Sequence, residues 1–154
     1  MANSIRHQIM DAVIDALEAI TTGGGYQTNV AYVSEVYQGY QELDLKKTPA
    51  VFPIDTDEQK RVDAIGVGTT DEMVSELTIA CTCIVHDRTN DTRLKRTNLI
   101  RDVEKALMNN TALAALIEYI APIDVVTDHG TIPNYSIWDQ SFMITYIYDS
   151  TNGG

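Results

Sequence analysis

The chain has 154 residues, of which 22 are acidic and 11 basic, so its formal net charge is −11; its hydrophobic fraction is 44%. This length fits a single domain with a substantial core. The negative charge disfavours a protein that binds nucleic acid over its whole surface, because phosphate binding requires clustered Lys and Arg. It does not exclude a local basic patch. No stretch reaches the roughly 20 apolar residues that span a bilayer, and the first residues lack the apolar run of a secretory signal. We therefore expect a protein that folds in a cytoplasm and has no membrane partner.

The first third of the chain predicts one helix and two short strands. Ser4 to about Thr21 has apolar residues at helical spacing, with Ser4 as the N-cap and three glycines directly after the helix. Gln27–Val36 is a strand candidate rich in Val and Tyr. Thr48–Ile54 is a shorter strand, and its prolines favour a position at the edge of a sheet.

The segment from Asp55 to Glu76 is predicted to be a long loop or β-arm, in which Lys60–Val67 could form a strand. It holds seven acidic residues, and residues 66–70, which are rich in Gly and Thr, are expected to form its tip. Long loops in compact domains are usually functional or disordered, so we interpret this segment as a partner-binding arm.

Ser75–Arg88 predicts a long strand with one apolar face, because Leu, Ile, Cys and Val alternate with polar or small residues. Cys81 and Cys83 point to the same side of this strand, which is not the usual arrangement of a disulfide pair. A metal site would need further Cys or His ligands at suitable spacing. We interpret both cysteines as small buried side chains.

The second half predicts a helix over Asn90–Asn110, a short helix over Thr111–Ile120, and strands over Ile123–Thr127 and Tyr135–Asp149. The two strands are close enough in sequence to pair as an antiparallel hairpin. One face of the last strand carries Trp138, Phe142, Ile144, Tyr146 and Tyr148. The aromatic side chains of this strand, Tyr135, Trp138, Tyr146 and Tyr148, are expected in the core and not in an interface. The tail, residues 150–154, is expected to be disordered.

This order of elements predicts an α+β fold for residues 1–149. The sheet is expected to be mostly antiparallel with about four to six strands, and two main helices are expected on one of its faces. No internal repeat or linker divides the chain.

Two patterns compete for a functional interpretation of the acidic segment. Asp55, Asp57 and Glu58 could form a divalent-metal site in a small enzyme, since Mg²⁺ sites use one or two carboxylates. However, no phosphate-binding loop or second carboxylate motif accompanies them, so a solvated acidic loop is the preferred interpretation. We assign no catalytic residue and no metal ligand, and we expect no cofactor.

The basic residues suggest an interface. Five of the eleven fall within fourteen positions: Arg88, Arg93, Lys95, Arg96 and Arg101. Several precede or begin a helix, where the helix dipole disfavours cations, so they need partners. Nearby aspartates and water are one solution. The other is the acidic arm of a neighbouring copy, contributing Asp55, Asp57, Glu58, Asp63, Asp71 and Glu72; such a head-to-tail contact can close into a ring.

Five segments together resemble the tail terminator proteins of long-tailed bacteriophages, including tail-terminator-like minor tail proteins of prophages. They are RHQIMDAVIDAL with its Gly-rich turn, TPAVFPIDTDEQ, LTIACTCIVHDR, LIRDVEKALMNNTAL and SFMITYIYDS, and they cover nearly the whole chain in the expected order.

The resemblance implies a virion protein without catalytic residues, assembled in the host cytoplasm as a homo-oligomeric ring, expected to be a hexamer. This ring would cap the tail tube, stop its polymerisation and offer a surface to which a neck or head-completion protein docks, while DNA passes through its lumen without specific binding. A loop would contact the tube protein, and the matching residues here are Gln59, Lys60, Arg61, Gly66, Gly68, Thr69 and Thr70. Neck and head-completion proteins are similar to this chain in size and general residue pattern, so an adaptor between portal and tail is the alternative.

Overall fold

The sheet is centred on β3 (Glu72–His86), which pairs antiparallel on one side with β2 (Ala50–Val62) and on the other with β5 (Tyr135–Asp149). These strands are seen in a computed structural model that describes residues 3–62 and 72–149. β4 (Tyr119–Thr127) pairs antiparallel with β5, and the two-residue β1 (Tyr32–Val33) pairs parallel with β2. The strand order is therefore β1-β2-β3-β5-β4.

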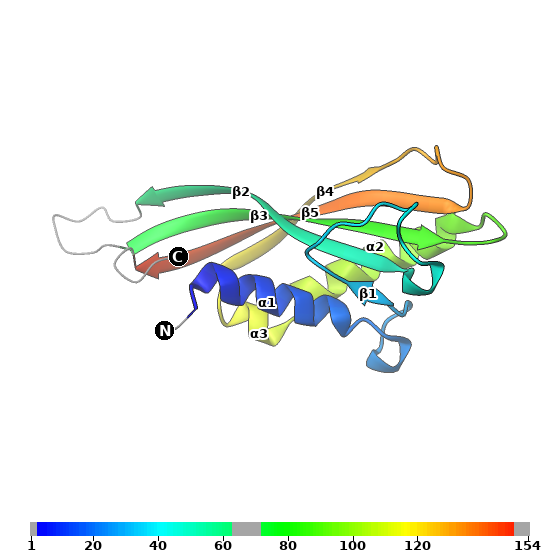
Figure 1. Cartoon of the computed structure of the whole chain (residues 1–154). Coiled ribbons are helices and arrows are strands. Elements are labelled where there is room, and N and C mark those ends of the chain that lie inside the picture. Colours follow the sequence, from blue (N-terminus) through cyan, green and yellow to red (C-terminus); the bar gives the residue numbers. More distant parts are fainter. Residues whose placement is uncertain (1–2, 63–71, 150–154) are drawn as a thin grey trace.

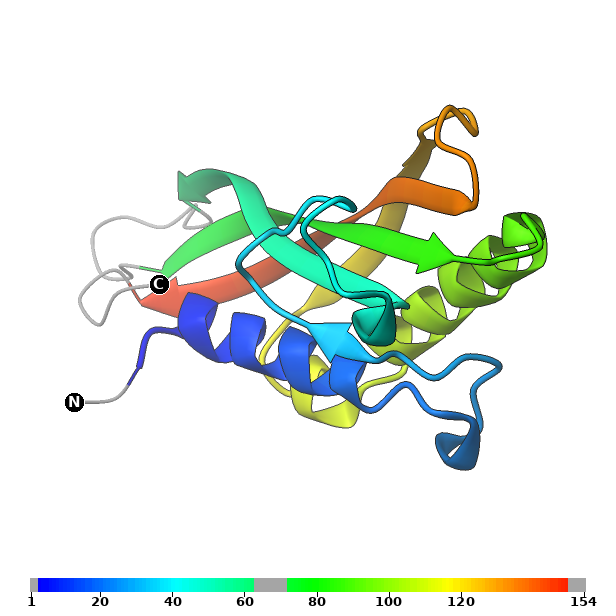
Figure 2. The same cartoon turned by 45° about the vertical axis from the view of Figure 1, so that its right-hand side comes forward.

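The helices lie on one face of this sheet (Figures 1 and 2). They are α1 (Ile5–Glu18), α2 (Thr92–Met108) and the short α3 (Thr111–Ala114), with 3-10 turns η1 (Thr22–Gly24) and η2 (Leu45–Lys47) in the loops. The predicted α+β fold, with a four- to six-stranded sheet and two main helices, is thus confirmed.

The main core fills the space between the helices and the inner face of the sheet. α1 contributes its predicted stripe of Ile and Val, and α2 contributes Leu99, Val103 and Leu107. The inner face of β3 supplies Cys81 and Cys83, both fully buried. The large β5 side chains Trp138, Phe142, Ile144, Tyr146 and Tyr148 are buried there too, which confirms the core prediction for Trp138, Tyr146 and Tyr148. Tyr135 is only partly buried and packs against the smaller cluster on the other face. Burying an aromatic or aliphatic side chain of this size stabilises a fold by roughly 1.5–3 kcal/mol.

A smaller cluster covers part of the opposite, outer face. Phe52 and Ile84 on the outer side of β2 and β3 are fully buried against Leu43, which belongs to the loop between β1 and β2. Tyr37 from the same loop stacks edge-on against Phe52, with ring centroids 5.5 Å apart. This loop therefore closes the outer face at one end of the sheet.

The segment from Asp55 to Glu76, predicted as a long loop or β-arm, is a β-arm in the part that the structure describes. β2 continues to Val62 and β3 starts at Glu72, so the two strands pair from Asp55 opposite Ile79 to Val62 opposite Met73. A β-bulge between Asp55 and Asp57 interrupts the alternation of side chains, which hid the strand from a period-two analysis.

Three other predicted elements differ in extent. The strand predicted over Gln27–Val36 is reduced to Tyr32–Val33, and the helix predicted over Thr111–Ile120 ends at Ala114. β4 begins at Tyr119 instead of Ile123 and contains Pro122. β4 is the last strand of the sheet, where proline is tolerated because its missing N–H does not interrupt a ladder.

The expected disordered tail, residues 150–154, and the tip of the arm, residues 63–71, lie outside the described residues. Among the residues that are described, no helix combines the length and apolar character needed to cross a bilayer.

Candidate functional site

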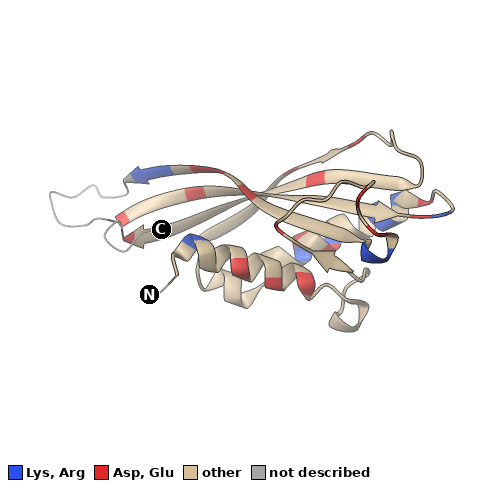
Figure 3. Cartoon of the chain, viewed as in Figure 1, with Lys and Arg blue, Asp and Glu red and all other residues tan. Residues whose placement is uncertain are grey.

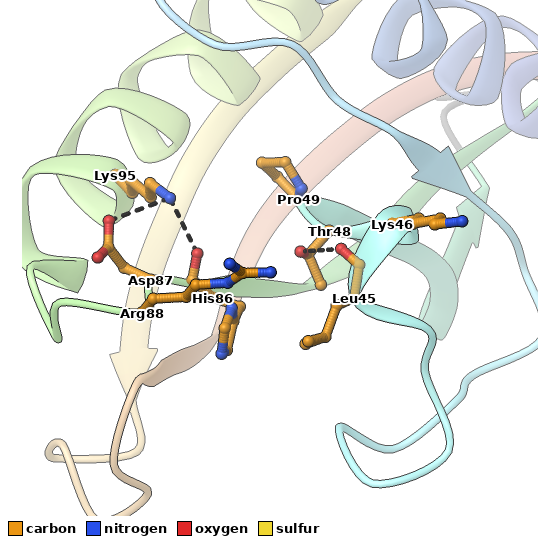
Figure 4. Close-up of a pocket in the computed structure, with 8 residues that line it drawn as sticks. All are labelled: Leu45, Lys46, Thr48, Pro49, His86, Asp87, Arg88 and Lys95. Atoms are coloured by element: carbon orange, nitrogen blue, oxygen red, sulfur yellow. Dashed lines mark hydrogen bonds and ion pairs between the residues drawn. The ribbon is translucent and has the colours of Figure 1, made fainter.

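A recess with basic walls lies where β3 leaves the sheet. It has a volume of about 490 Å³ and is lined by Leu45, Lys46, Thr48, Pro49, His86, Asp87, Arg88 and Lys95. The first four come from the η2 segment before β2, and the others from the end of β3 and the first turn of α2. Figure 4 shows these two walls, with Arg88 extending between them. We call this recess and the adjacent Arg93 and Leu94 the basic end.

One cation of the basic end is neutralised within the chain. The Lys95 ammonium lies 3.1 Å from the Asp87 carboxylate and donates a hydrogen bond of 2.9 Å to the His86 carbonyl oxygen. The same carboxylate accepts hydrogen bonds from the Thr89 hydroxyl and backbone N–H, and these, together with Lys95, hold the pKa of Asp87 well below its usual value. Of the two alternatives for Lys95, a nearby aspartate or the acidic arm of another copy, the structure shows the nearby aspartate within the chain.

Other cations of the basic end keep their charge available. Within the described part of the chain, the side chains of Lys46, Arg88 and Arg93 make no ion pair or hydrogen bond, and all three residues are exposed. Leu94 is 60% exposed and Leu45 is 45% exposed, so apolar surface accompanies these charges. A guanidinium such as that of Arg88 can bind a carboxylate through two parallel hydrogen bonds.

The remaining two basic residues of the predicted cluster lie elsewhere. The Arg96 guanidinium donates a 3.0 Å hydrogen bond to the hydroxyl of Ser136, which is buried in β5. Arg101 is exposed further along α2, where it lines a separate recess with Glu104 and Met108. The structure thus brings Arg88 and Lys95 into one recess, with Arg93 nearby on α2, and separates Arg96 and Arg101 from them.

At the opposite end of the long strands, a charge network joins α1 to the sheet. Because of the bulge in β2, Asp55 and Glu58 both point to the helix side. The Arg6 guanidinium donates to the Asp55 carboxylate and, at 2.7 Å, to that of Glu58. Glu58 also accepts hydrogen bonds from the hydroxyls of Ser75 and Tyr146. The preferred interpretation of Glu58 as part of a solvated loop was therefore wrong: its side chain is only 6% exposed.

These partners set the ionisation of the network. Burial opposes the charge on Glu58, but hydrogen bonds from Ser75 and Tyr146, together with Lys60 and Arg6, outweigh it and lower the pKa of this carboxyl. Burial and the hydrogen bond to Glu58 raise the pKa of Tyr146. Asp55 and Glu58 therefore act as structural anions that fasten the first turn of α1 to β2, β3 and β5.

The other residues predicted for the arm lie on both faces of the sheet or outside the described residues. Asp57 and Gln59 lie on the outer face beside Glu76, and Arg61 is 3.7 Å from the Glu76 carboxylate. Lys60 lies on the helix side, 4.6 Å from the centre of the Tyr148 ring. Glu72 is exposed at the start of β3. Gln59, Lys60 and Arg61 thus belong to a paired strand. Six predicted residues lie outside the described residues: Asp63, Gly66, Gly68, Thr69, Thr70 and Asp71.

The described residues of the acidic segment form no cluster of metal ligands. Within residues 3–62 and 72–149, no group of three or more His, Cys, Asp or Glu side chains is placed to hold a metal ion. Burial raises the pKa of Cys81 to about 12 and that of Cys83 as well, so both thiols stay protonated, as expected for packing residues.

Sequence reasoning missed several residues at both ends. Arg6 carries the same signal that drew attention to the cations of α2, because it is a cation in the first turn of a helix. Ser75 and Tyr146 gave no signal, since their role depends on strand register. Leu45 and Lys46 reach the basic end only through the path of the loop between β1 and β2.

No protein-family model and no curated protein matches this sequence. The resemblance to tail terminators consequently stays a prediction that rests on the segments quoted above.

Proposed function

We propose that this chain is a non-enzymatic virion assembly subunit, a tail terminator that forms a ring on the end of a phage tail tube. The observation that carries the proposal is the basic end. On a chain with net charge −11, exposed Arg88 and Arg93 lie beside exposed leucines and have no partner among the described residues. Such a surface suits contact with an acidic protein surface.

The distribution of charge supports a head-to-tail arrangement. Figure 3 shows basic positions concentrated at the ends of the long strands, whereas acidic positions follow α1 and the sheet. β3 alone spans roughly 50 Å at about 3.3 Å per residue, so its two ends are far enough apart to contact different subunits of a ring. A contact between unlike surfaces is heterologous, and repetition of it closes a ring when the rotation fits.

The proposed mechanism is geometric. Ring closure would bury the heterologous contacts, and one face of the ring would mate with the last ring of the tube so that no further tube subunit could add. The other face would receive a neck or head-completion protein. The acidic excess would flank a lumen through which DNA moves without sticking.

The test is assembly with and without tail tube protein. Analytical ultracentrifugation and electron microscopy of the pure chain are expected to show a ring, and its addition to polymerising tube protein is expected to limit tube length. Binding to portal protein in place of tube ends would identify a neck adaptor instead. A chain that remains monomeric and binds neither would contradict the proposal.

A further inference from the structure

A second recess lies on the outer face of the sheet and has properties that complement the basic end. Its volume is about 490 Å³, and its lining includes Tyr37, Ile54, Thr82, Val126, Asp128 and Asp139. Thr82, Asp139 and Val126 lie opposite one another on β3, β5 and β4, in one row across the sheet. This row alternates with residues that face the helices, which places the recess on the side away from them. We call it the outer recess.

The outer recess combines carboxylates with apolar walls. Asp139 is exposed at its rim and accepts a 2.6 Å hydrogen bond from the Thr82 hydroxyl. One carboxylate oxygen of Asp128 is used by the Gly130 N–H, whereas the other is buried and has no hydrogen-bond partner. The exposed carboxylate of Asp139 is therefore the one that a second molecule can reach.

Exposed apolar residues gather around these carboxylates. Tyr37 is 50% exposed and Val126 is 57% exposed, and both line the recess. Interfaces typically bury apolar and aromatic groups at their centre and place charges at the rim. An arginine fits such a recess well, because its aliphatic stem packs on apolar surface while its guanidinium reaches a carboxylate.

The basic end of the same chain offers the matching groups. Exposed Leu45 lines the recess with Arg88, and exposed Leu94 follows Arg93 in the first turn of α2. The side chains of Arg88 and Arg93 have no partner within the described residues. The carboxylates Asp55 and Glu58 of the opposite end are already bound by Arg6, which makes them poorer partners. No described contact joins the basic end to the outer recess inside one copy.

We infer that the outer recess receives the basic end of a second copy of this chain, with Arg88 directed toward Asp139. The inference rests on the proposed self-assembly and names its mating surfaces. Apolar contact of Leu45 or Leu94 with Tyr37 and Val126 supplies the buried area. The charges fix the orientation of the two copies and disfavour other modes of docking.

The experiment uses charge reversal and a charge swap on the full chain. Arg88→Glu and Asp139→Arg are each expected to weaken assembly by at least about tenfold in concentration, measured by analytical ultracentrifugation at about 0.1 M salt. An equimolar mixture of the two variants is expected to recover assembly, because each interface then joins opposite charges again. Val126→Ser is expected to weaken assembly without a change in charge.

Asp15→Arg is the matched control, because Asp15 is an exposed carboxylate on α1, on the other side of the sheet. It is expected to leave assembly unchanged. All variants alter exposed residues, and thermal unfolding will verify that each still folds.

The outcomes separate this inference from the proposed ring. Assembly that is unchanged in Arg88→Glu and Asp139→Arg, or that Asp15→Arg alone disrupts, overturns the inference and leaves the ring intact. Assembly that stops at a dimer, is lost in both reversals and recovers in the mixture supports the mating surfaces and overturns the ring. A parent chain that stays monomeric overturns both.

Discussion

Both ends of the long strands carry charged side chains, but the two ends differ in how far these are paired within the chain. Near the start of α1, the Arg6 guanidinium is shared by two carboxylates, one of which also accepts hydrogen bonds from Ser75 and Tyr146. At the end of β3, Lys95 is paired with Asp87, whereas Arg88 is exposed and has no partner among the described residues. One charged cluster thus holds the fold together, whereas Arg88 and Arg93 in the other have no partner among the described residues.

The largest expected effect that separates the ends is on stability. Glu58→Ala leaves Arg6, Ser75 and Tyr146 without their shared acceptor, and Ser75 and Tyr146 are fully buried. Unpaired buried polar groups cost about 1–3 kcal/mol each, so we expect the free energy of unfolding to fall by about 3 kcal/mol in urea titrations. Arg88→Ala, the matched change at the basic end, is expected to stay within about 0.5 kcal/mol. An equal loss of unfolding free energy in the two variants would show that the two ends do not differ in their contribution to stability.

A smaller effect is expected from acid. The pKa of Glu58 is lowered in the folded state, so its contribution to stability is present above the ordinary glutamate pKa of 4.5 and is lost as the pH falls through the lower, folded value. Urea titrations at pH 7 and at acidic pH should therefore show a larger loss in the parent chain than in Glu58→Gln, which cannot titrate. Identical losses in both would show that other carboxylates account for the acid sensitivity.

The smallest effect is expected at Lys95. The Lys95 side chain is 47% exposed, and ion pairs that reach the surface contribute little because water and salt screen them. We expect Lys95→Met to leave the melting temperature unchanged, as measured by circular dichroism. A clear drop would show that the basic end, like the opposite end, also supports the fold.

The fold could be predicted where one physical signal acted alone. β3 and β5 alternate regularly, and α1 has a clean stripe and a Ser4 cap whose hydroxyl accepts from the His7 N–H. Prediction failed where the pattern was interrupted. The bulge in β2 places Asp55 and Glu58 on one side despite a spacing of three, and another register shift follows Pro122 in β4. A short apolar run such as that before Pro122 fits a helix or a strand equally well.

The candidate site was only partly predictable for a different reason. The position of Arg88 and Arg93 before and within the first turn of a helix signalled a need for partners, and that cue is local. Whether the partner exists inside the chain depends on contacts between distant segments, such as Arg6 with Glu58, 52 residues apart. No local pattern contains that information.

The two buried cysteines can report how often the helices detach from the sheet. Cys81 and Cys83 lie at the centre of the sheet, fully covered by the helix layer, and their raised pKa keeps them unreactive there. A thiol reagent can reach them only when α1 or α2 detaches from the sheet, so the rate of labelling measures the frequency of that opening. Followed before and after assembly, this rate would reveal whether docking at the outer face tightens the layer beneath it.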